Sequence, residues 1–174
     1  SGVNFVVTPK GIRFGLSAIK NVGVSAVENI VRSRSEKGRF HDMFDFCGRV
    51  YLRLVNKKTT EGLIQAGAFD SLHDNRAQLF QNVEAATGYG QNEQEHSGRG
   101  QSNLFAGSTA KIDVKPNMKA MAQWGDMEKL SREKAVLGFY VTGHPLLKYA
   151  EEIEAFASAK LGSPAIAFSS NSPG

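Results

Sequence analysis

The chain has one cysteine and no apolar run long enough to cross a membrane. Cys47 alone cannot form a disulfide within the chain, which excludes a small disulfide-stabilised scaffold. The apolar run 135–141 is far shorter than the ~20 residues that a membrane-spanning helix needs. The first residues show no basic region followed by a long apolar segment, so no secretory signal is visible. We therefore expect a cytoplasmic protein.

The composition is otherwise ordinary, but the charge is unevenly distributed. The 174 residues are 41% hydrophobic and 22% charged, which is typical of globular proteins and leaves room for one domain or two small ones. Residues 1–60 contain 11 Lys and Arg against four Asp and Glu, a net charge of +7. The remaining residues contain 10 against 13, a net charge of −3. This asymmetry indicates that the first third of the chain meets a polyanion.

The first half of the chain shows short helical patterns separated by tight turns. A β-hairpin is expected over 4–14, around Pro9-Lys10-Gly11. A helix-turn-helix follows, with Ser25 as the expected N-cap of a helix that ends at Gly38, and then a short helix that begins near His41 or Asp42. Asn56 is expected to cap a further helix that ends at Gly67, and apolar spacing predicts another helix over about 75–87.

The second half is expected to contain a flexible linker and two helices. Residues 88–123 are rich in Gly, Gln, Asn and Ser, which predicts a mobile segment. Helices are expected over 126–138 and around 147–159, with a loose tail after them. The resulting division is 1–14, a β-hairpin; 15–87, a tandem hairpin unit; 88–123, the linker; 124–160, a helical segment; and 161–174, the tail.

The turn Asn21-Val22-Gly23 carries the main chemical prediction. A tight turn before a helix presents backbone N–H groups at the helix N-terminus, where unpaired donors and the helix dipole favour a phosphate. Gly23 would let the phosphate approach, and Asn21 tolerates the left-handed backbone that such a turn needs. Val22 would anchor the turn in the core. Ending a helix is the alternative role for an isolated Gly23.

A second turn, Gln65-Ala66-Gly67-Ala68, has the same setting but a poorer match. It lacks the first glycine, and Asp70 and Asp74 lie close to it. It is expected either to touch phosphate or to serve as a packing partner for the first turn.

Six segments together resemble the alpha subunit of bacterial DNA polymerase III, a C-family replicative polymerase. They are 12–16, 18–23, 45–47, 55–58, 63–72 and Leu137-Gly138-Phe139-Tyr140-Val141-Thr142-Gly143-His144-Pro145-Leu146. Their order and spacing agree with that family over roughly 3–155, and Gly100-Gln101-Ser102-Asn103-Leu104-Phe105 matches a short motif in the family's variable linker. The resemblance implies a mainly α fold, with a tandem helix-hairpin-helix bundle, a small N-terminal β-hairpin and a flexible linker before C-terminal helices.

The resemblance also implies a function, namely holding primer-template duplex DNA during replication without sequence preference. The residues expected to contact DNA are Lys20, Asn21, Val22, Gly23, Val24, Ser25, Arg32, Arg34, Lys57, Lys58, Gly67 and Arg76. Implied partners are duplex DNA and other polymerase III subunits, such as the sliding clamp through neighbouring regions, with no membrane. The alternative is a protein-protein scaffolding module in the replisome that binds little DNA.

No catalytic residue is expected in this segment, although the implied parent is a DNA-directed DNA polymerase, a nucleotidyltransferase. Two-metal chemistry needs clustered carboxylates, and the sequence has no Asp-x-Asp pair. Asp42 and Asp45 are better explained by the N-terminus of a short helix. No cofactor is expected here; Mg²⁺ would belong to the parent's palm domain, and a monovalent cation could sit at the hairpin. Cys47 is expected in the core, and Trp124 is expected to anchor the end of the linker.

Overall fold

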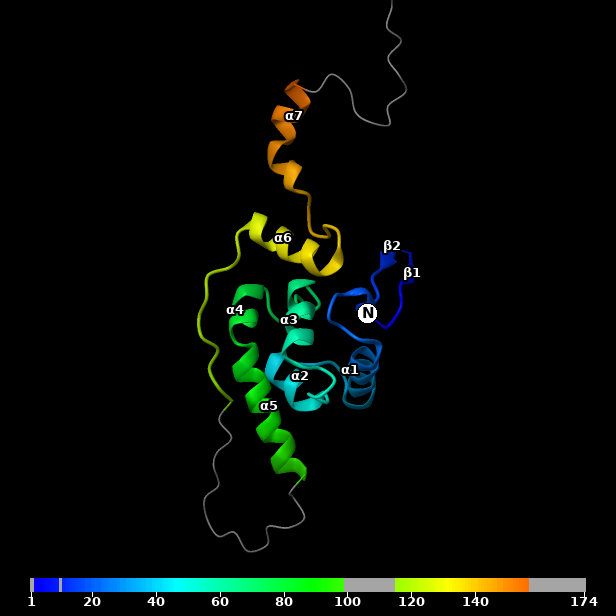
Figure 1. Cartoon of the computed structure of the whole chain (residues 1–174), viewed down its shortest axis with the longest axis vertical. Helices are drawn as coiled ribbons and strands as arrows, with labels where there is room; N and C mark the ends of the chain where they lie inside the picture. Colours follow the sequence, from blue (N-terminus) through cyan, green and yellow to red (C-terminus); the bar gives the residue numbers. More distant parts are fainter. Residues whose placement is uncertain (1, 10, 99–114, 157–174) are drawn as a thin grey trace, which may run out of the picture.

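A computed structural model describes residues 2–9, 11–98 and 115–156. In these ranges the chain is mainly helical, with one two-stranded sheet near the amino terminus (Figure 1). This confirms the mainly α class and the N-terminal β-hairpin. None of the helices in the described ranges is both long enough and apolar enough to span a bilayer.

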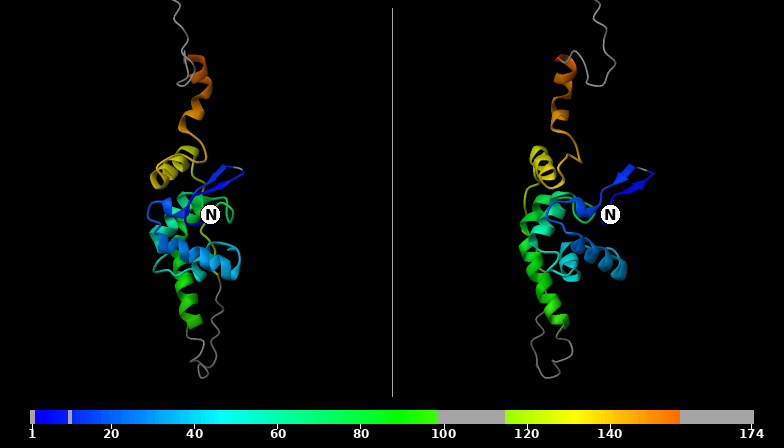
Figure 2. Two further views of the ribbon diagram at one scale, coloured as in Figure 1. Left: turned by 90° about the vertical axis from the view of Figure 1, so that its right-hand side faces the viewer. Right: turned by 45° about the vertical axis from the view of Figure 1, so that its right-hand side comes forward.

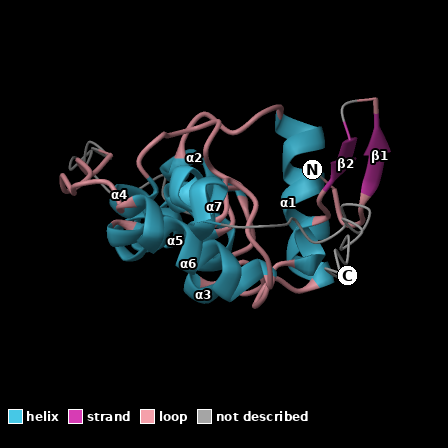
Figure 3. Ribbon diagram, turned by 90° about the horizontal axis from the view of Figure 1, so that it is seen from above, coloured by secondary structure: helices cyan, strands magenta, loops and turns pink. Residues whose placement is uncertain are grey.

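The sheet is an antiparallel ribbon of β1 (Val6–Thr8) and β2 (Gly11–Arg13), with Val7 paired to Ile12. The ribbon extends away from the helical body beside α1 (Val24–Lys37) (Figures 2 and 3). Its base is held by aromatic rings, because Phe14 contacts both Phe5 and Phe139 with ring centroids 4.5 and 5.1 Å apart. The ribbon leads into a short 3₁₀ turn, η1 (Leu16–Ala18), which precedes the first hairpin.

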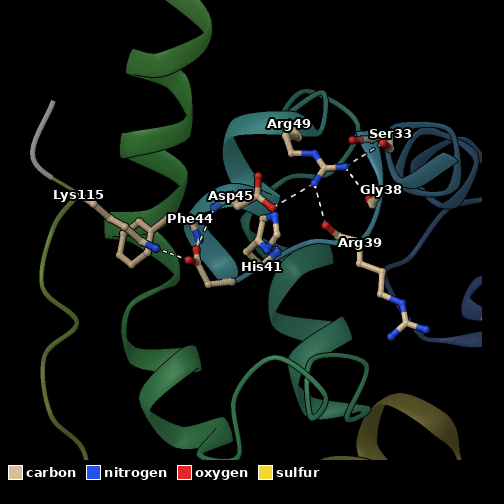
Figure 4. A network of polar contacts seen from close by, with 9 residues as sticks. Ser33, Gly38, Arg39, His41, Phe44, Asp45, Arg49 and Lys115 are labelled. Carbon is tan, nitrogen blue, oxygen red and sulfur yellow. Dashed lines mark hydrogen bonds and ion pairs between the residues drawn. The ribbon is translucent and has the colours of Figure 1, made fainter. Parts of the chain in front are cut away.

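Helix α1 ends at Gly38, as expected, where the backbone turns to a φ of 77°. The helix end is held by α2 (Met43–Arg49), because the Arg49 guanidinium donates hydrogen bonds to the carbonyls of Ser33, Gly38 and Arg39 (Figure 4). A cation at this position also opposes the negative end of the helix dipole. Asp45 completes the contact at 3.1 Å from Arg49.

Local capping explains where α2 and α3 begin. The Asp42 carboxylate accepts hydrogen bonds from the Phe44 and Asp45 amides, and it also pairs with Lys115 (Figure 4). Burial alone would raise the pKa of Asp42, but Lys115 and these amides outweigh it and lower the pKa. The expected cap Asn56 accepts from the Thr59 amide at the start of α3 (Lys57–Gln65).

Between these helices lies one apolar core, and the side chains of Val27, Ile64 and Cys47 are fully buried in it. Burial raises the pKa of the Cys47 thiol to about 12. The burial confirms that Cys47 is a core residue. With this raised pKa, almost none of the thiol is ionised to the reactive thiolate near neutral pH.

The expected helix over 75–87 is two helices, and the second is longer than predicted. α4 (Arg76–Gln81) and α5 (Val83–Gly98) are separated at Asn82. The prediction of a linker from residue 88 is therefore wrong for residues 88–98. Gln94 holds this part of α5 against α2 by donating to the carbonyls of Cys47, Gly48 and Val50, and the Gly90 backbone packs directly against Cys47.

The remaining linker prediction divides in two. Residues 99–114 lie outside the described residues, while 115–123 run along the helical body instead of standing free. Asn82 both donates to the Lys119 carbonyl and accepts from the Lys119 amide, and Asn75 donates to the Met121 carbonyl. Trp124 then packs on Phe80 with ring centroids 5.7 Å apart, which confirms it as a docking residue.

The chain continues into α6 (Asp126–Leu137), which ends at Gly138 as expected. Beyond it follow the 3₁₀ turn η2 (Pro145–Tyr149) and α7 (Ala150–Phe156), neither of which has a buried residue. His144 caps η2 by accepting a hydrogen bond from the Leu146 amide. In Figure 1, α6 lies across the end of α3, and α7 extends away from the body.

Candidate nucleic-acid interface

The first hairpin is built on a four-residue turn from Ile19 to Val22. The Val22 amide donates to the Ile19 carbonyl at 3.0 Å, and Asn21 at the third position has a φ of 67°. A turn with a positive φ at this position is type II, which favours Gly or Asn there. The prediction that Asn21 adopts a left-handed backbone is therefore confirmed. Val22 is buried in the core, as expected.

The turn leads directly into the N-terminus of α1, which is open to solvent. The N-cap residue is Gly23 and not Ser25, so the predicted N-cap was two residues too late. Gly23 supplies no side-chain acceptor to the first amides, and a Cβ placed there would meet nothing within 4 Å. Val24 and Ser25 are exposed. These positions combine a positive helix end with open space in front of it.

Two other helices, α3 and α6, hold the backbone of the turn from behind. The Lys20 amide donates to the Val136 carbonyl of α6 at 2.8 Å. The Thr59 hydroxyl of α3 donates to the Asn21 carbonyl at 3.0 Å. Gly62 of α3 lies so close to the turn that an added Cβ would be 2.9 Å from the Lys20 oxygen. Sequence reasoning missed Thr59, Gly62 and Val136, because no local pattern marks partners so distant in the chain.

Lysines lie on both sides of this helix end. Lys20 is exposed in the turn, and Lys57 and Lys58 are exposed in the first turn of α3. Because the Asn21 carbonyl touches Thr59, the start of α3 lies beside the hairpin. Lys57 pairs with Glu84 of α5 at 3.0 Å, which raises the pKa of Lys57 and lowers that of Glu84. The open N-terminus of α1, Lys20 and Lys58 thus bring positive charge to this edge, whereas Glu84 offsets the charge of Lys57.

The two arginines of α1 do not face the same surroundings. Arg32 is exposed, about 12 Å along the helix from Val24 at 1.5 Å per residue. Arg34 is half-buried and lines an apolar cavity of about 240 Å³ with Phe40, Leu63 and other side chains. Arg32 is therefore open to solvent and stays a candidate for phosphate contact, whereas Arg34 contributes to the wall of the cavity.

The second hairpin is turned inward. Gly67 has a left-handed φ of 79°, but the space beside it is filled by the Arg76 guanidinium. Arg76 is 5% exposed and binds Asp70 through two hydrogen bonds of 2.5 and 2.6 Å, and Glu133 of α6 through one of 2.7 Å. The structure therefore separates Gly67 and Arg76 from the exposed edge, and we do not include them in the interface.

The N-terminus of α4 is also occupied. The Asn75 side chain accepts from the Gln78 amide and donates to the Met121 carbonyl of the segment that lies over it. This arrangement corresponds to the packing-partner alternative for the second hairpin. Within the residues that the structure describes, no group of three or more His, Cys, Asp and Glu side chains could hold a metal ion.

Comparisons with known proteins show which family the sequence resembles. A family model described as a helix-hairpin-helix motif matches residues 1–79. The DNA polymerase III subunit alpha of Neisseria meningitidis is 40% identical over 150 residues, which is 86% of this chain and 13% of the relative. The proteins of the same name from Caulobacter vibrioides and Mycobacterium tuberculosis are each 38% identical, over 84% of this chain and 13% of each relative. The chain thus spans about one eighth of the length of the curated relatives it matches.

Proposed function

Because the chain belongs to the family of bacterial DNA polymerase III alpha subunits, we propose that its first hairpin binds the phosphate backbone of duplex DNA without sequence preference. The observation that carries this proposal is the open N-terminus of α1 behind the Asn21 turn, with Lys20 beside it. The relatives and the helix-hairpin-helix match support DNA as the partner.

The mechanism is electrostatic. The amides of Gly23, Val24 and Ser25 point toward one phosphate, and the helix dipole adds a partial positive charge at the same place. Lys20 and Lys58 neutralise neighbouring phosphates, and Arg32 reaches one further along. Contacts to phosphates position a protein on DNA but read no bases, so binding should tolerate any sequence.

At the level of the whole protein, we propose a role in replicative DNA synthesis in the cytoplasm, as part of a DNA-directed DNA polymerase. The segment would grip the primer-template, while carboxylates and Mg²⁺ elsewhere in the polypeptide perform nucleotidyl transfer. On its own this chain should bind DNA and not extend it. Contacts with other replisome subunits, including the sliding clamp, would come from neighbouring regions. We do not extend the proposal to a monovalent cation at the hairpin, because the Ile19 and Asn21 carbonyls accept hydrogen bonds and the Lys20 carbonyl faces α3.

The test is fluorescence anisotropy of a labelled duplex of mixed sequence, titrated with the 174-residue chain at several salt concentrations. Two to four phosphate contacts predict a slope of about −2 to −4 in a plot of log K against log salt concentration. A second duplex of unrelated sequence should give the same affinity. Replacing Lys20 with Glu should weaken binding and reduce the slope by about 1.

The matched control is Lys148→Glu, which makes the same change of charge in η2, on the far side of α6 from α1 (Figure 1). If both variants weaken binding equally, the effect comes from net charge and the hairpin site is wrong. If the parent chain binds no duplex even at low salt, the DNA-binding proposal itself is wrong.

A scaffolding role is the second candidate, and one observation favours it. The β1–β2 ribbon exposes apolar side chains to solvent, with Val7 85% and Ile12 74% exposed. Exposed apolar surface of this kind is typical of contacts between proteins. A chain that fails to bind duplex while this ribbon is protected by a replisome protein would support scaffolding over DNA binding.

A further inference from the structure

We propose that Thr59 is the positioning residue of the phosphate site, an inference that rests on the proposed DNA-binding function. Its hydroxyl fixes the direction in which the chain enters α1. Thr59 belongs to α3 and would not touch DNA itself, because its side chain is buried. It acts through the Asn21 carbonyl, to which it donates at 3.0 Å across 38 residues of sequence.

The backbone amide and the side-chain hydroxyl of Thr59 donate to different residues. The Asn56 side chain accepts the Thr59 N–H as the N-cap of α3. The neighbouring Thr60 differs, because its hydroxyl donates to the Asn56 carbonyl within the same helix at 3.1 Å. Two adjacent buried threonines therefore have different partners, one in the hairpin and one within α3.

The Asn21–Val22 peptide is held at both ends. Its oxygen accepts from Thr59, and its N–H donates to the Ile19 carbonyl at 3.0 Å. A peptide group is a rigid plane, so two anchored ends fix its orientation. The next peptides lead to Gly23 and the first amides of α1. The orientation of the plane thus sets where these amides point.

The second carbonyl of the turn also faces α3. The Lys20 oxygen lies against Gly62, one helical turn beyond Thr59, and the Lys20 amide is held by Val136. These backbone contacts fix Lys20, whereas the carbonyl end of the Asn21–Val22 peptide is held by the Thr59 hydroxyl. Without it, the left-handed Asn21 can rotate this peptide away from α3, because Asn tolerates several turn conformations.

The experiment compares four versions of the 174-residue chain: the parent, Thr59→Val, Thr59→Ser and Thr60→Val. Thr59→Val keeps the branched shape and removes the hydroxyl, Thr59→Ser restores it, and Thr60→Val removes a hydroxyl that does not reach the hairpin. Affinity for the labelled duplex is measured at a temperature at which circular dichroism shows each variant fully folded. A loss of stability alone then leaves the affinity unchanged.

Thr59→Val should weaken duplex binding about three- to tenfold, the loss expected for one hydrogen bond, while Thr59→Ser and Thr60→Val bind as the parent does. A second readout is the ¹⁵N–¹H spectrum during the titration. The amide signals of Val24 and Ser25 should shift with duplex in the parent and in Thr60→Val, and shift less in Thr59→Val.

Two results would overturn the proposal and leave the DNA-binding function intact. In one, Thr59→Val binds as the parent does. In the other, Thr59→Val and Thr60→Val weaken binding equally, which would show a general structural effect of losing a buried hydroxyl. A parent chain that fails to bind duplex and shows no shift of Val24 and Ser25 would instead refute the DNA-binding function on which the proposal rests.

Discussion

Removing the Glu133 carboxylate should destabilise the protein strongly, because this group joins α6 to the second hairpin. Glu133 is fully buried. One oxygen accepts from Arg76 at 2.7 Å, and the other accepts from the Val141 and Thr142 amides and the Thr142 hydroxyl at 3.1–3.3 Å. Truncating this side chain removes all four hydrogen bonds and leaves the buried Arg76 guanidinium with only one of its two carboxylate partners.

The magnitude follows from what remains around Arg76. Removing one partner of a buried ion pair costs about 3–5 kcal/mol, mainly because the other charge is left unpaired. Asp70 still binds the Arg76 guanidinium through two hydrogen bonds. We therefore expect Glu133→Ala to fall at the lower end, about 3 kcal/mol. For a protein of this size, this loss lowers the melting temperature by about 6–12 °C.

The assay is thermal and urea unfolding followed by far-ultraviolet circular dichroism, with Glu128→Ala as the matched control. Glu128 lies on the same helix and also pairs with an arginine, Arg132, but its side chain is 50% exposed. Such an exposed pair contributes about 0.2–1 kcal/mol. If Glu133→Ala loses no more stability than Glu128→Ala, the reasoning about the buried pair is wrong.

The same pair predicts a dependence on pH. Burial alone would raise the pKa of Glu133, but hydrogen bonds from Thr142, Arg76 and Val141 outweigh it and lower the pKa. A carboxylate with a lowered pKa stabilises the fold above its ordinary value of about 4.3, and this contribution is lost as the pH falls through the folded-state pKa. The stabilities of the parent and Glu133→Ala should therefore converge in acid. Curves that stay parallel would contradict this assignment.

Two further predictions concern single positions. Asn21→Val should lower the free energy of unfolding in urea by about 1–2 kcal/mol, because a β-branched side chain disfavours a φ of 67°. Asn21→Gly should keep both stability and duplex affinity. Equal losses in the two variants would contradict the turn assignment. Cys47 should resist a thiol reagent at pH 8 in the native protein and react fully in urea, because in the native protein the thiol is buried and its pKa is about 12. Rapid labelling of the native protein would show that the core opens locally.

Features set by a few neighbouring residues could be predicted from the sequence. The ends of α1 and α6 at Gly38 and Gly138, and the cap of α3 at Asn56, follow from the backbone preferences of Gly and Asn. The start of α1 was placed two residues late. Ser25 is a better side-chain cap than Gly23, but the backbone of the preceding turn already determined where the helix begins.

Features that depend on distant partners could not be predicted. The polar residues of 88–98 suggested a linker, but Gln94 reaches three carbonyls at the end of α2 and holds the helix there. Arg76 was expected on the DNA, but its partner Glu133 is 57 residues further along the chain. In both cases a polar side chain, which the sequence suggests is exposed, makes hydrogen bonds to another part of the protein. The periodicity of the sequence does not indicate which residues are its partners.

The position of α6 has a consequence for the order of events during synthesis. Both hairpins make hydrogen bonds to α6, the first through Lys20 and Val136 and the second through Arg76 and Glu133. Because α6 follows both hairpins in the sequence, it leaves the ribosome after them. Contacts between residues so far apart close a long loop and form late. A nascent chain that ends before residue 126 therefore carries both hairpin sequences without the helix that sets their geometry. The proposed phosphate site therefore reaches its final geometry only after α6 has been translated.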